Sequence, residues 1–321
     1  MLRRKILVFL LLVALLMSFY QLTKTVRSSS TTLKITPERN IFAANITAPG
    51  SKFIINVTVT DVTDLFAWQI GLAYNNSLIN FTKIILPSDH VFAGKSFLET
   101  PVVTEPGVVY YGITLGPGQT SVNVASGTLC QLEFEILDPS ITGVTLPALC
   151  TLHFIDSDYT FLLNHIGAVI ESTWQESIFA YSYLRASTVT VDGQEFNLFT
   201  CSNGEMVPGS LEVLTAEKAI KFNLTGTSGF GFVNITIPKA LLNGNPSAWT
   251  VYVNDATTPA QITWNATHTF VYVEFNFGSQ VAIKIKGTWI VPEFVNMSLL
   301  AIFLTGMAAT TVLVKTKKAK N

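Results

Sequence analysis

An apolar run near the C-terminus constrains this chain more than any other feature of its sequence. Residues 295–314 carry no charge, and at about 1.5 Å per helical residue they match the roughly 30 Å hydrocarbon core of a bilayer. The lysines that follow favour the cytoplasmic side of a membrane: Lys315, Lys317, Lys318 and Lys320. We therefore expect residues 291–321 to hold a transmembrane helix and a basic tail, with the rest of the chain outside the cell.

The N-terminus supports the same topology. Arg3, Arg4 and Lys5 precede an uncharged run at residues 6–19, which is the layout of a secretory signal. We expect residues 1–27 to be a signal peptide, with an uncleaved signal anchor as the alternative. Both ends together predict a cell-membrane protein, anchored by a single C-terminal pass, whose folded mass is extracellular.

The exported part of the chain is acidic. Residues 28–293 contain 11 Lys and Arg against 21 Asp and Glu, a net charge of −10. Such a surface repels the phosphates of nucleic acids, so we expect no nucleic acid among the partners.

Glycosylation sequons are about twice as frequent as chance predicts, with eight in the chain. Asn-x-Ser/Thr marks an acceptor only in an exported protein, and a strand-rich chain full of Asn and Thr also forms such triplets incidentally. Asn296 lies at the expected membrane boundary and is set aside. The expected acceptors are Asn45, Asn56, Asn75, Asn80, Asn223, Asn234 and Asn265.

The cysteines are too few for a disulfide scaffold. Cys130 and Cys150 share the parity of apolar neighbours on consecutive expected strands, so both should face a core. They could form a disulfide that closes about 20 residues and contributes roughly 3 kcal/mol. Two separate thiols are the alternative, and Cys201 is left over in either case.

The chain between its ends is predicted to be all β. Short alternating apolar segments separated by Gly, Pro, Asn and Asp run from Leu33 to Trp289, and such spacing is typical of sandwiches. About 255 residues is long for one sandwich, and Val189-Thr-Val-Asp-Gly193 has the pattern of a closing strand and turn. We divide the chain there, into residues 33–192 and a second, smaller β-sandwich at residues 193–290.

Residues 49–85, which read PGSKFIINVTVTDVTDLFAWQIGLAYNNSLINFTKII, resemble the opening of cohesin domains. Residues 107–114, the segment SGTLCQLEFEI at 126–136 and the VTVDG at 189–193 continue the resemblance in the correct order. It covers residues 33–192 and implies a jelly-roll sandwich, of the carbohydrate-binding-domain superfamily, that docks a partner without catalysis. Asn75 stands where the family's corner Asp is expected.

The tail is similar to those of archaeal surface proteins, since Pro292-Glu293-Phe294 precedes the apolar run and the basic end. This resemblance implies a sorting signal near which a membrane protease cuts. A simple anchor is the alternative. Residues 193–290 resemble the membrane-proximal β domain that often precedes such tails.

No catalytic set is evident, and we expect no enzyme, metal or cofactor. The four histidines lack metal-binding spacing, and no nucleophile elbow or phosphate loop occurs. Asp156-Ser-Asp158 could offer two oxygen ligands, but turns favour Asp in any case. Glu133 and Glu135 are expected on a solvated sheet face, because Leu132 and Phe134 point inward.

Two residues are the candidates for binding. Strand parity places Gln69 outward among the small residues Ala67, Gly71 and Ala73, and Tyr110 faces outward near it. We predict a non-catalytic surface protein or envelope scaffold that docks another extracellular protein there. The alternative is a module that binds surface polysaccharide, since exposed tyrosines also stack on sugars.

Overall fold

The computed structural model describes residues 31–290. The predicted signal segment, the Pro-Glu-Phe motif, the transmembrane helix, the basic tail and Asn296 therefore lie outside the described residues. Within residues 31–290, no helix is both long and apolar enough to cross a membrane.

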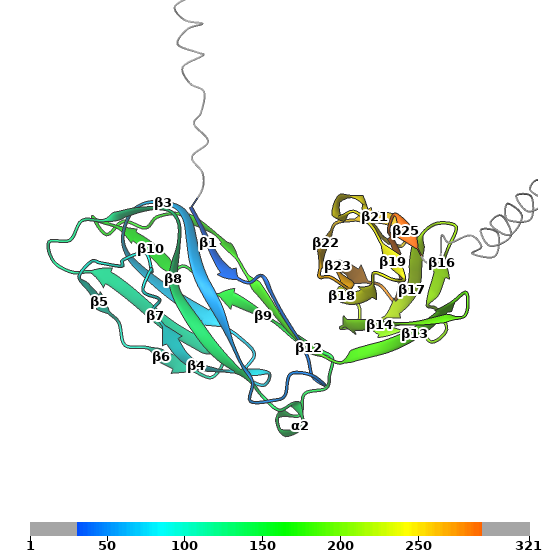
Figure 1. Ribbon diagram of the computed structural model, residues 1–321. Coiled ribbons are helices and arrows are strands. Elements are labelled where there is room, and N and C mark those ends of the chain that lie inside the picture. The colour runs from blue at the N-terminus through cyan, green and yellow to red at the C-terminus, as the bar shows by residue number, and fades with distance from the viewer. Residues whose placement is uncertain (1–30, 291–321) are drawn as a thin grey trace, which may run out of the picture. The chain divides into compact units, whose positions relative to one another are not determined.

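The described residues are mostly strand and form two compact units (Figure 1). Unit 1 comprises residues 31–39, 52–136 and 151–178, and unit 2 comprises residues 40–51, 137–150 and 179–290. Three strands each begin in one of these ranges and end in the other: β2 (Arg39–Ala43), β9 (Ala148–Phe154) and β12 (Ser177–Ser182). The all-β class predicted from the sequence is confirmed.

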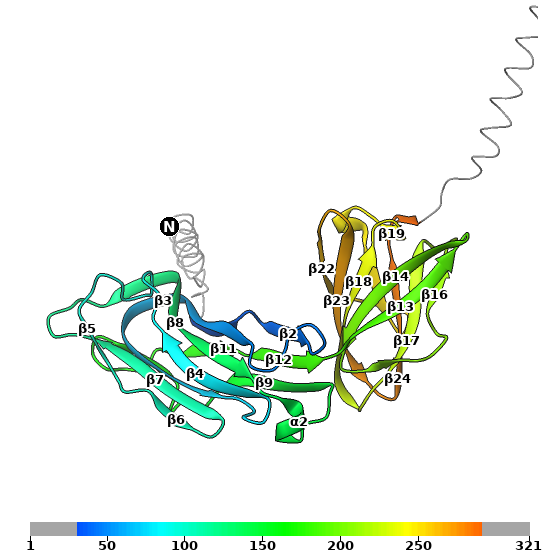
Figure 2. The same ribbon diagram turned by 60° about the horizontal axis from the view of Figure 1, so that its bottom comes forward.

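Unit 1 is organised around one long strand, β3 (Lys52–Ala73), which runs along much of the unit and curves around one end of it (Figure 2). The other strands within unit 1 are β1 (Thr31–Thr36), β4 (Ile79–Ile85), β5 (Phe97–Glu99), β6 (Val103–Glu105), β7 (Val108–Leu115), β8 (Val122–Ile136), β10 (Phe161–Asn164) and β11 (Ser172–Gln175). The first half of β3 pairs with β1 and β8, and its second half pairs with β7 and β10. One strand thus contributes to both layers of the sandwich.

The change of layer occurs at a bulge in β3. Asp61 and Asp64 both have positive φ, and the pairing with β8 shifts register between Val62 and Leu65. The Asp64 backbone N–H donates to Asn123 Oδ1 at 2.8 Å, and the Asp64 carboxylate lies 2.6 Å from His165 Nδ1. These two contacts, one with β8 and one with the loop after β10, stabilise the bulge.

The core of unit 1 follows strand alternation. Cys130, Leu132, Phe134 and Ile136 on β8 are fully buried, as their shared parity predicts. Phe134 lies at the centre, with its ring centroid 5.7 Å from Phe53, 5.1 Å from Tyr74 and 5.9 Å from Phe81. Trp68, Ile70 and Leu72 of β3 are also buried.

Unit 2 is a second β-sandwich, as predicted. One sheet has the order β13 (Leu184–Val191), β14 (Gln194–Ser202), β18 (Gly229–Pro238), β23 (His268–Phe277), β22 (Ala260–Trp264). The other has the order β15 (Glu205–Met206), β17 (Ala219–Thr225), β24 (Gln280–Lys286), β20 (Thr250–Val253), β21 (Ala256–Thr258), with β16 (Glu212–Leu214) paired to β17. Alternate side chains of both sheets, such as Phe222 and Val233, form a shared apolar core.

The remaining described elements are short: α2 (Pro139–Thr142), β19 (Leu242–Asn243), η1 (Pro246–Ala248) and β25 (Trp289–Ile290). Strand β19 pairs with β25.

The expected division after Asp192 falls inside a hairpin. Val191 pairs with Gln194 across the turn formed by Asp192 and Gly193, both of which have positive φ. The segment Val189–Gly193 therefore does not close the first sandwich. It belongs to β13 and its turn in unit 2, because a strand's alternation does not identify the sheet in which it pairs.

Candidate functional site

Gln69 and Tyr110 lie on one outward face of unit 1, as the sequence predicts. Gly71 of β3 pairs with Tyr110 of β7, and Gln69 pairs with Gly112. Directly paired residues of an antiparallel sheet project from the same side. The two candidate binding residues are therefore near neighbours on the sheet.

Tyr159 completes this face, although the sequence reasoning did not identify it. Its ring centroid is 5.2 Å from that of Tyr110, with the two planes tilted by 44°. The Gln69 side-chain amide donates to the Tyr159 carbonyl oxygen at 3.1 Å. Tyr159 is 45% exposed, so the aromatic pair is partly accessible to solvent.

Thr160 fixes the position of Tyr159 against the sheet. Its hydroxyl accepts a hydrogen bond from the Gly71 N–H at 3.1 Å and donates to the Gly71 carbonyl oxygen at 3.1 Å. Thr160 is buried. The loop that carries Tyr159 and Thr160 is thus attached to β3, because the Thr160 hydroxyl bonds to both backbone groups of Gly71 as a neighbouring strand would.

Gly71 allows the two tyrosines to lie close to the sheet. A Cβ atom at this position would be 3.0 Å from Tyr159 Cβ and 3.1 Å from Tyr110 Cε1, tighter than nine in ten real Cβ contacts. With any other residue here, the two tyrosines would have to shift by a few tenths of an ångström. We call the surface formed by Gln69, Gly71, Tyr110, Gly112 and Tyr159 the tyrosine face.

Apolar side chains border the tyrosine face on one side. Val103 pairs with Tyr110 and is 50% exposed, and Leu98 pairs with Thr114 and is 60% exposed. They belong to β6 and β5, which both pair with β7. Val103 is therefore directly beside Tyr110, and Leu98 lies further along the same side of β7.

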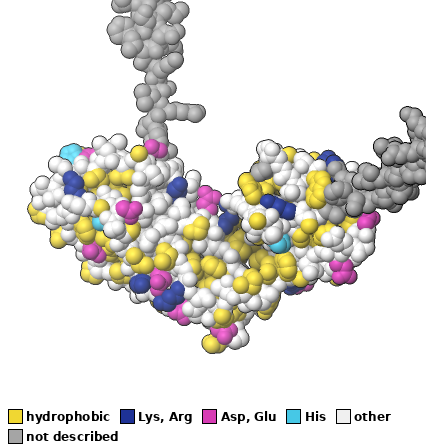
Figure 3. All heavy atoms as spheres, in the orientation of Figure 1, with side chains coloured by type: hydrophobic (Ala, Val, Ile, Leu, Met, Phe, Trp, Pro, Cys, Tyr) yellow, Lys and Arg dark blue, Asp and Glu magenta, His cyan; other side chains and the backbone are white. Residues whose placement is uncertain are grey.

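Carboxylates lie near the Tyr110 hydroxyl. Partial burial, together with the nearby Glu105, Tyr159 and Asp156, raises the pKa of Tyr110. In the space-filling view, charged side chains are scattered among predominantly hydrophobic and uncharged ones (Figure 3). The tyrosine face therefore has an acidic margin, whereas its five residues carry no charge.

Asp156 and Asp158 form a turn. Asp156 Oδ1 accepts the Asp158 N–H at 3.0 Å, and the Asp156 carbonyl oxygen accepts the N–H groups of Tyr159 and Thr160. No group of three or more His, Cys, Asp or Glu that could hold a metal ion occurs among residues 31–290. The turn positions Tyr159 and supplies part of the acidic margin.

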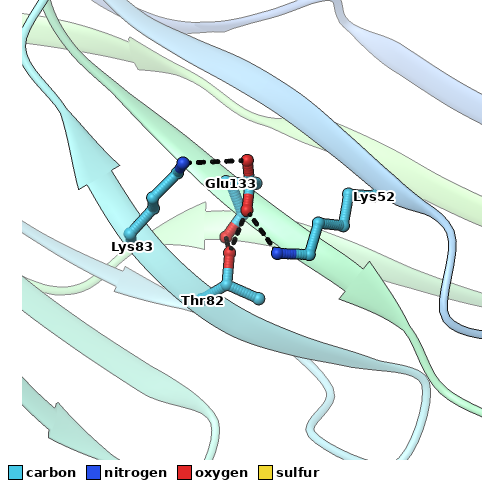
Figure 4. Close-up of polar contacts among 4 residues, drawn as sticks. All are labelled: Lys52, Thr82, Lys83 and Glu133. Atoms are coloured by element: carbon cyan, nitrogen blue, oxygen red, sulfur yellow. Dashed lines mark hydrogen bonds and ion pairs between the residues drawn. The ribbon is translucent and has the colours of Figure 1, made fainter.

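Glu133 corrects an expectation. It projects opposite to Leu132 and Phe134, but it is only 9% exposed and not solvated. Its carboxylate lies 3.0 Å from Lys52 Nζ and 3.5 Å from Lys83 Nζ, and accepts from the Thr82 hydroxyl at 2.8 Å (Figure 4). The long lysine side chains from β3 and β4 cover it.

We predict that Glu133 makes the thermal stability of the protein depend on pH in the acidic range. Hydrogen bonds from Lys52 and Thr82 lower its pKa from 4.5 to about 2. Because the pKa is depressed in the folded state, this contribution is fully present above pH 4.5 and is lost as the pH falls toward 2. Glu133→Gln should lower the midpoint of thermal unfolding by several degrees at pH 7 and have little effect near pH 2.

The control for this prediction is Glu135→Gln, on the same strand and half-exposed. It should leave the midpoint almost unchanged at both pH values. If Glu133→Gln lowered the midpoint of thermal unfolding equally at pH 7 and pH 2, the ion-pair explanation would be contradicted.

Of the two arrangements left open for Cys130 and Cys150, the structure has the two separate thiols. Cys130 on β8 and Cys150 on β9 belong to different units, and no disulfide joins them in the structure. Burial raises the pKa of the Cys130 thiol. Cys201 is buried in β14, and burial raises the pKa of its thiol to about 11. Thiols in such surroundings are unreactive.

The described sequon asparagines are all at least partly exposed, and none belongs to the tyrosine face. Asn45, Asn75, Asn80 and Asn265 are exposed. Asn56 lies within β3, Asn223 within β17 and Asn234 within β18, and each is half-buried. The sequon asparagines therefore differ both in exposure and in whether they lie within a strand.

Comparison with known proteins returns no match among protein-family models and none among curated proteins. Solved structures that resemble this chain include cohesin domains. The solution structure of the cohesin CaCohA2 from Clostridium acetobutylicum is 16% identical, covers 49% of this chain and 94% of that chain, and has a TM-score of 0.37.

Two further cohesin structures have similar sequence identities, coverages and TM-scores. A type I cohesin–dockerin complex from Clostridium thermocellum is 12% identical, covers 48% of this chain and 95% of that chain, and has a TM-score of 0.39. A non-cellulosomal cohesin from the hyperthermophilic archaeon Archaeoglobus fulgidus is 14% identical, covers 48% and 91%, and has a TM-score of 0.35. The cohesin-like sandwich predicted from the sequence agrees with these likenesses, which concern the fold alone.

Proposed function

We propose that this chain is a non-catalytic cell-surface protein that docks another extracellular protein through the tyrosine face of unit 1. The observation that carries this proposal is the Tyr110–Tyr159 pair, held over Gly71 by Thr160 and Gln69. Tyrosine is enriched at interfaces because it offers a large apolar area together with a hydroxyl, at a small cost in conformational entropy.

The surroundings of the tyrosine face support protein docking. Gly71 and Gly112 are buried beneath neighbouring groups, so the surface that a partner would meet is formed by the side chains of Gln69, Tyr110 and Tyr159. Leu98 and Val103 add exposed apolar area beside the aromatic pair. The acidic margin, with Glu105 and Asp156, would favour a partner with basic groups at its rim and would raise the rate of association.

A surface location is part of the proposal. The basic N-terminal segment, the apolar run at residues 295–314 and the lysines after it support an exported ectodomain with one C-terminal membrane pass. The Pro-Glu-Phe motif at residues 292–294 supports an archaeal type of surface tail. The sequons fit such a glycoprotein.

Polysaccharide binding is the alternative that the tyrosine pair also allows. Stacking on a sugar ring uses the face of an aromatic ring, and platforms for extended glycans present several rings in one plane. Here the two planes are tilted by 44°, and the neighbouring exposed side chains are aliphatic. This geometry favours a protein partner over a glycan.

Hydroxyl-radical footprinting of the full chain tests the proposed function. On intact cells, oxidation of Tyr159 should be several-fold slower than in the purified, detergent-solubilised protein, because a bound partner excludes solvent. Tyr183 is the matched control, since it is 46% exposed against 45% for Tyr159 and lies in unit 2. Its oxidation should be the same in both samples.

Adding back fractions distinguishes the two candidate partners. A surface-protein fraction that restores Tyr159 protection to the purified chain supports protein docking, and a polysaccharide fraction that does so supports the alternative. If Tyr159 is oxidised equally on cells and after purification, the tyrosine face is not a docking surface.

A further inference from the structure

The described sequons differ in what their side chains contact, and the geometry points to two of them as sites of modification. We propose that the folded protein accepts N-linked glycans at Asn75 and Asn265 and not at the other described sequons. In the cell this rests on the export that forms part of the proposed function. The choice between sequons depends only on the fold.

Asn75 and Asn265 are both exposed and both form a turn with their own sequon. Asn75 Oδ1 accepts the Ser77 N–H at 2.9 Å, and Asn265 Oδ1 accepts the Thr267 N–H at 2.9 Å. In both, the amide oxygen is bonded to the residue that carries the sequon hydroxyl, and Nδ2 makes no hydrogen bond to any described residue. The Thr267 hydroxyl contacts only exposed groups of its own turn here, at 3.3 Å from Asn265 Oδ1 and 2.8 Å from His268 Nδ1, whereas the Thr82 hydroxyl of the Asn80 sequon is bonded to the buried Glu133. The triplet is thus already folded into one compact turn that an enzyme can read.

Asn45 is equally exposed, but its amide is occupied. Asn45 Nδ2 donates to the Leu184 carbonyl oxygen at 2.9 Å, and Asn45 Oδ1 accepts the Leu184 N–H at 2.9 Å. The Asn45 amide therefore satisfies both backbone groups of Leu184, as a neighbouring strand would. Modification of Nδ2 would compete with this pair of hydrogen bonds.

Asn80 is exposed, but its sequon hydroxyl is occupied. The Thr82 hydroxyl lies 2.8 Å from Glu133 Oε1 and 3.0 Å from the Glu133 carbonyl oxygen, within the covered ion-pair cluster. Asn80 pairs with Glu135 of β8, and Thr82 lies at the register shift between Phe81 and Lys83, so this sequon is part of a paired strand and not of a turn. An enzyme that reads the hydroxyl would have to displace it from Glu133.

The other described sequons lie inside paired strands. Asn56 pairs with Thr36 and Gln131, and Gln131 Nε2 donates to Asn56 Oδ1 at 2.8 Å. Asn234 pairs with Cys201 and Tyr272, both of which are buried.

Asn223 of β17 pairs with Ala282 of β24, and its N–H donates to Ser210 Oγ at 3.0 Å. None of these three strand sequons forms a turn.

The reaction sets these requirements. Transfer forms a bond between Asn Nδ2 and the anomeric carbon of the first sugar. The donor is a lipid-linked oligosaccharide, and the bond between that carbon and the donor's phosphate oxygen breaks. The lipid phosphate is the leaving group, and one Nδ2 proton is released. The acceptor must therefore present Nδ2 to the donor while the hydroxyl at the third position is recognised.

The test is transfer in vitro to the purified, unglycosylated full chain. A single-subunit oligosaccharyltransferase that reads Asn-x-Ser/Thr is supplied with lipid-linked oligosaccharide, and occupancy is measured by glycopeptide mass spectrometry. The folded chain should be modified at Asn75 and Asn265 at least about tenfold more than at Asn45 and Asn80. Ser77→Ala and Thr267→Ala should each abolish only their own site.

The unfolded chain provides the control. In urea at a concentration that the enzyme tolerates and the protein does not, Asn45 and Asn80 should gain occupancy relative to Asn75 and Asn265. Modification of folded Asn45 or Asn80 to the same extent as Asn75 and Asn265, or of none of them, would overturn the proposal. Neither result bears on Tyr159 protection, so a failure here is distinct from a failure of the docking proposal.

Discussion

Replacing Phe134 with alanine is expected to unfold unit 1 under conditions in which the native chain is stable. Phe134 is fully buried and contacts the rings of Phe53, Tyr74 and Phe81. Removing such a side chain typically costs about 3–5 kcal/mol, through lost burial and the cavity left behind. A domain of this size has only about 5–15 kcal/mol of stability, so most of it could be lost.

Hydrogen exchange resolved to peptides of β3 and β8 measures this loss within unit 1. Both strands should exchange at least about 100-fold faster in Phe134→Ala, since every 1.4 kcal/mol is a factor of ten. Ile166→Ala is the control, because Ile166 is 75% exposed and its loss should change exchange little. Exchange in β8 that stays within threefold of the native rate would show that Phe134 is not the centre of this core.

The core of unit 1 could be predicted from the sequence because strand alternation is local. Once one face of β8 is apolar, Cys130, Leu132, Phe134 and Ile136 must share it, and all of them are fully buried. The outward positions of Gln69 and Tyr110 follow from the same rule. Strand alternation determines which side chains share a face of the strand, whichever strand pairs with it.

The features that were missed depend on contacts between distant residues. Tyr159 joins the face because Thr160 bonds to Gly71, which is 89 residues away in the sequence. Glu133 is covered because Lys52, 81 residues away, lies across it. No local pattern reveals either contact.

The closing strand was misplaced for a related reason. The pattern at residues 189–193 correctly indicates a strand and a turn, yet Val191 pairs with Gln194 in unit 2. A strand carries the same alternation whether it ends one sandwich or begins the next. The turn residues Asp192 and Gly193 were a hairpin signal, because Asp-Gly favours a tight two-residue turn.

Replacing Tyr110 and Tyr159 together with alanine is expected to weaken docking by at least about 30-fold, and more if the two losses add. Interface tyrosines commonly contribute about 2 kcal/mol or more each when they are truncated. Stability should change much less than in Phe134→Ala, since Tyr159 is 45% exposed and Tyr110 is half-buried. Titration of the full chain with the surface fraction that restores Tyr159 protection gives the affinity.

The comparison with Tyr183→Ala tests the docking claim most directly, because Tyr183 matches Tyr159 in exposure and lies in unit 2. We expect Tyr183→Ala to bind like the native chain and the Tyr110→Ala/Tyr159→Ala variant to lose binding while its β3 and β8 amides remain protected. Equal affinities for the folded double variant and the native chain would contradict the account.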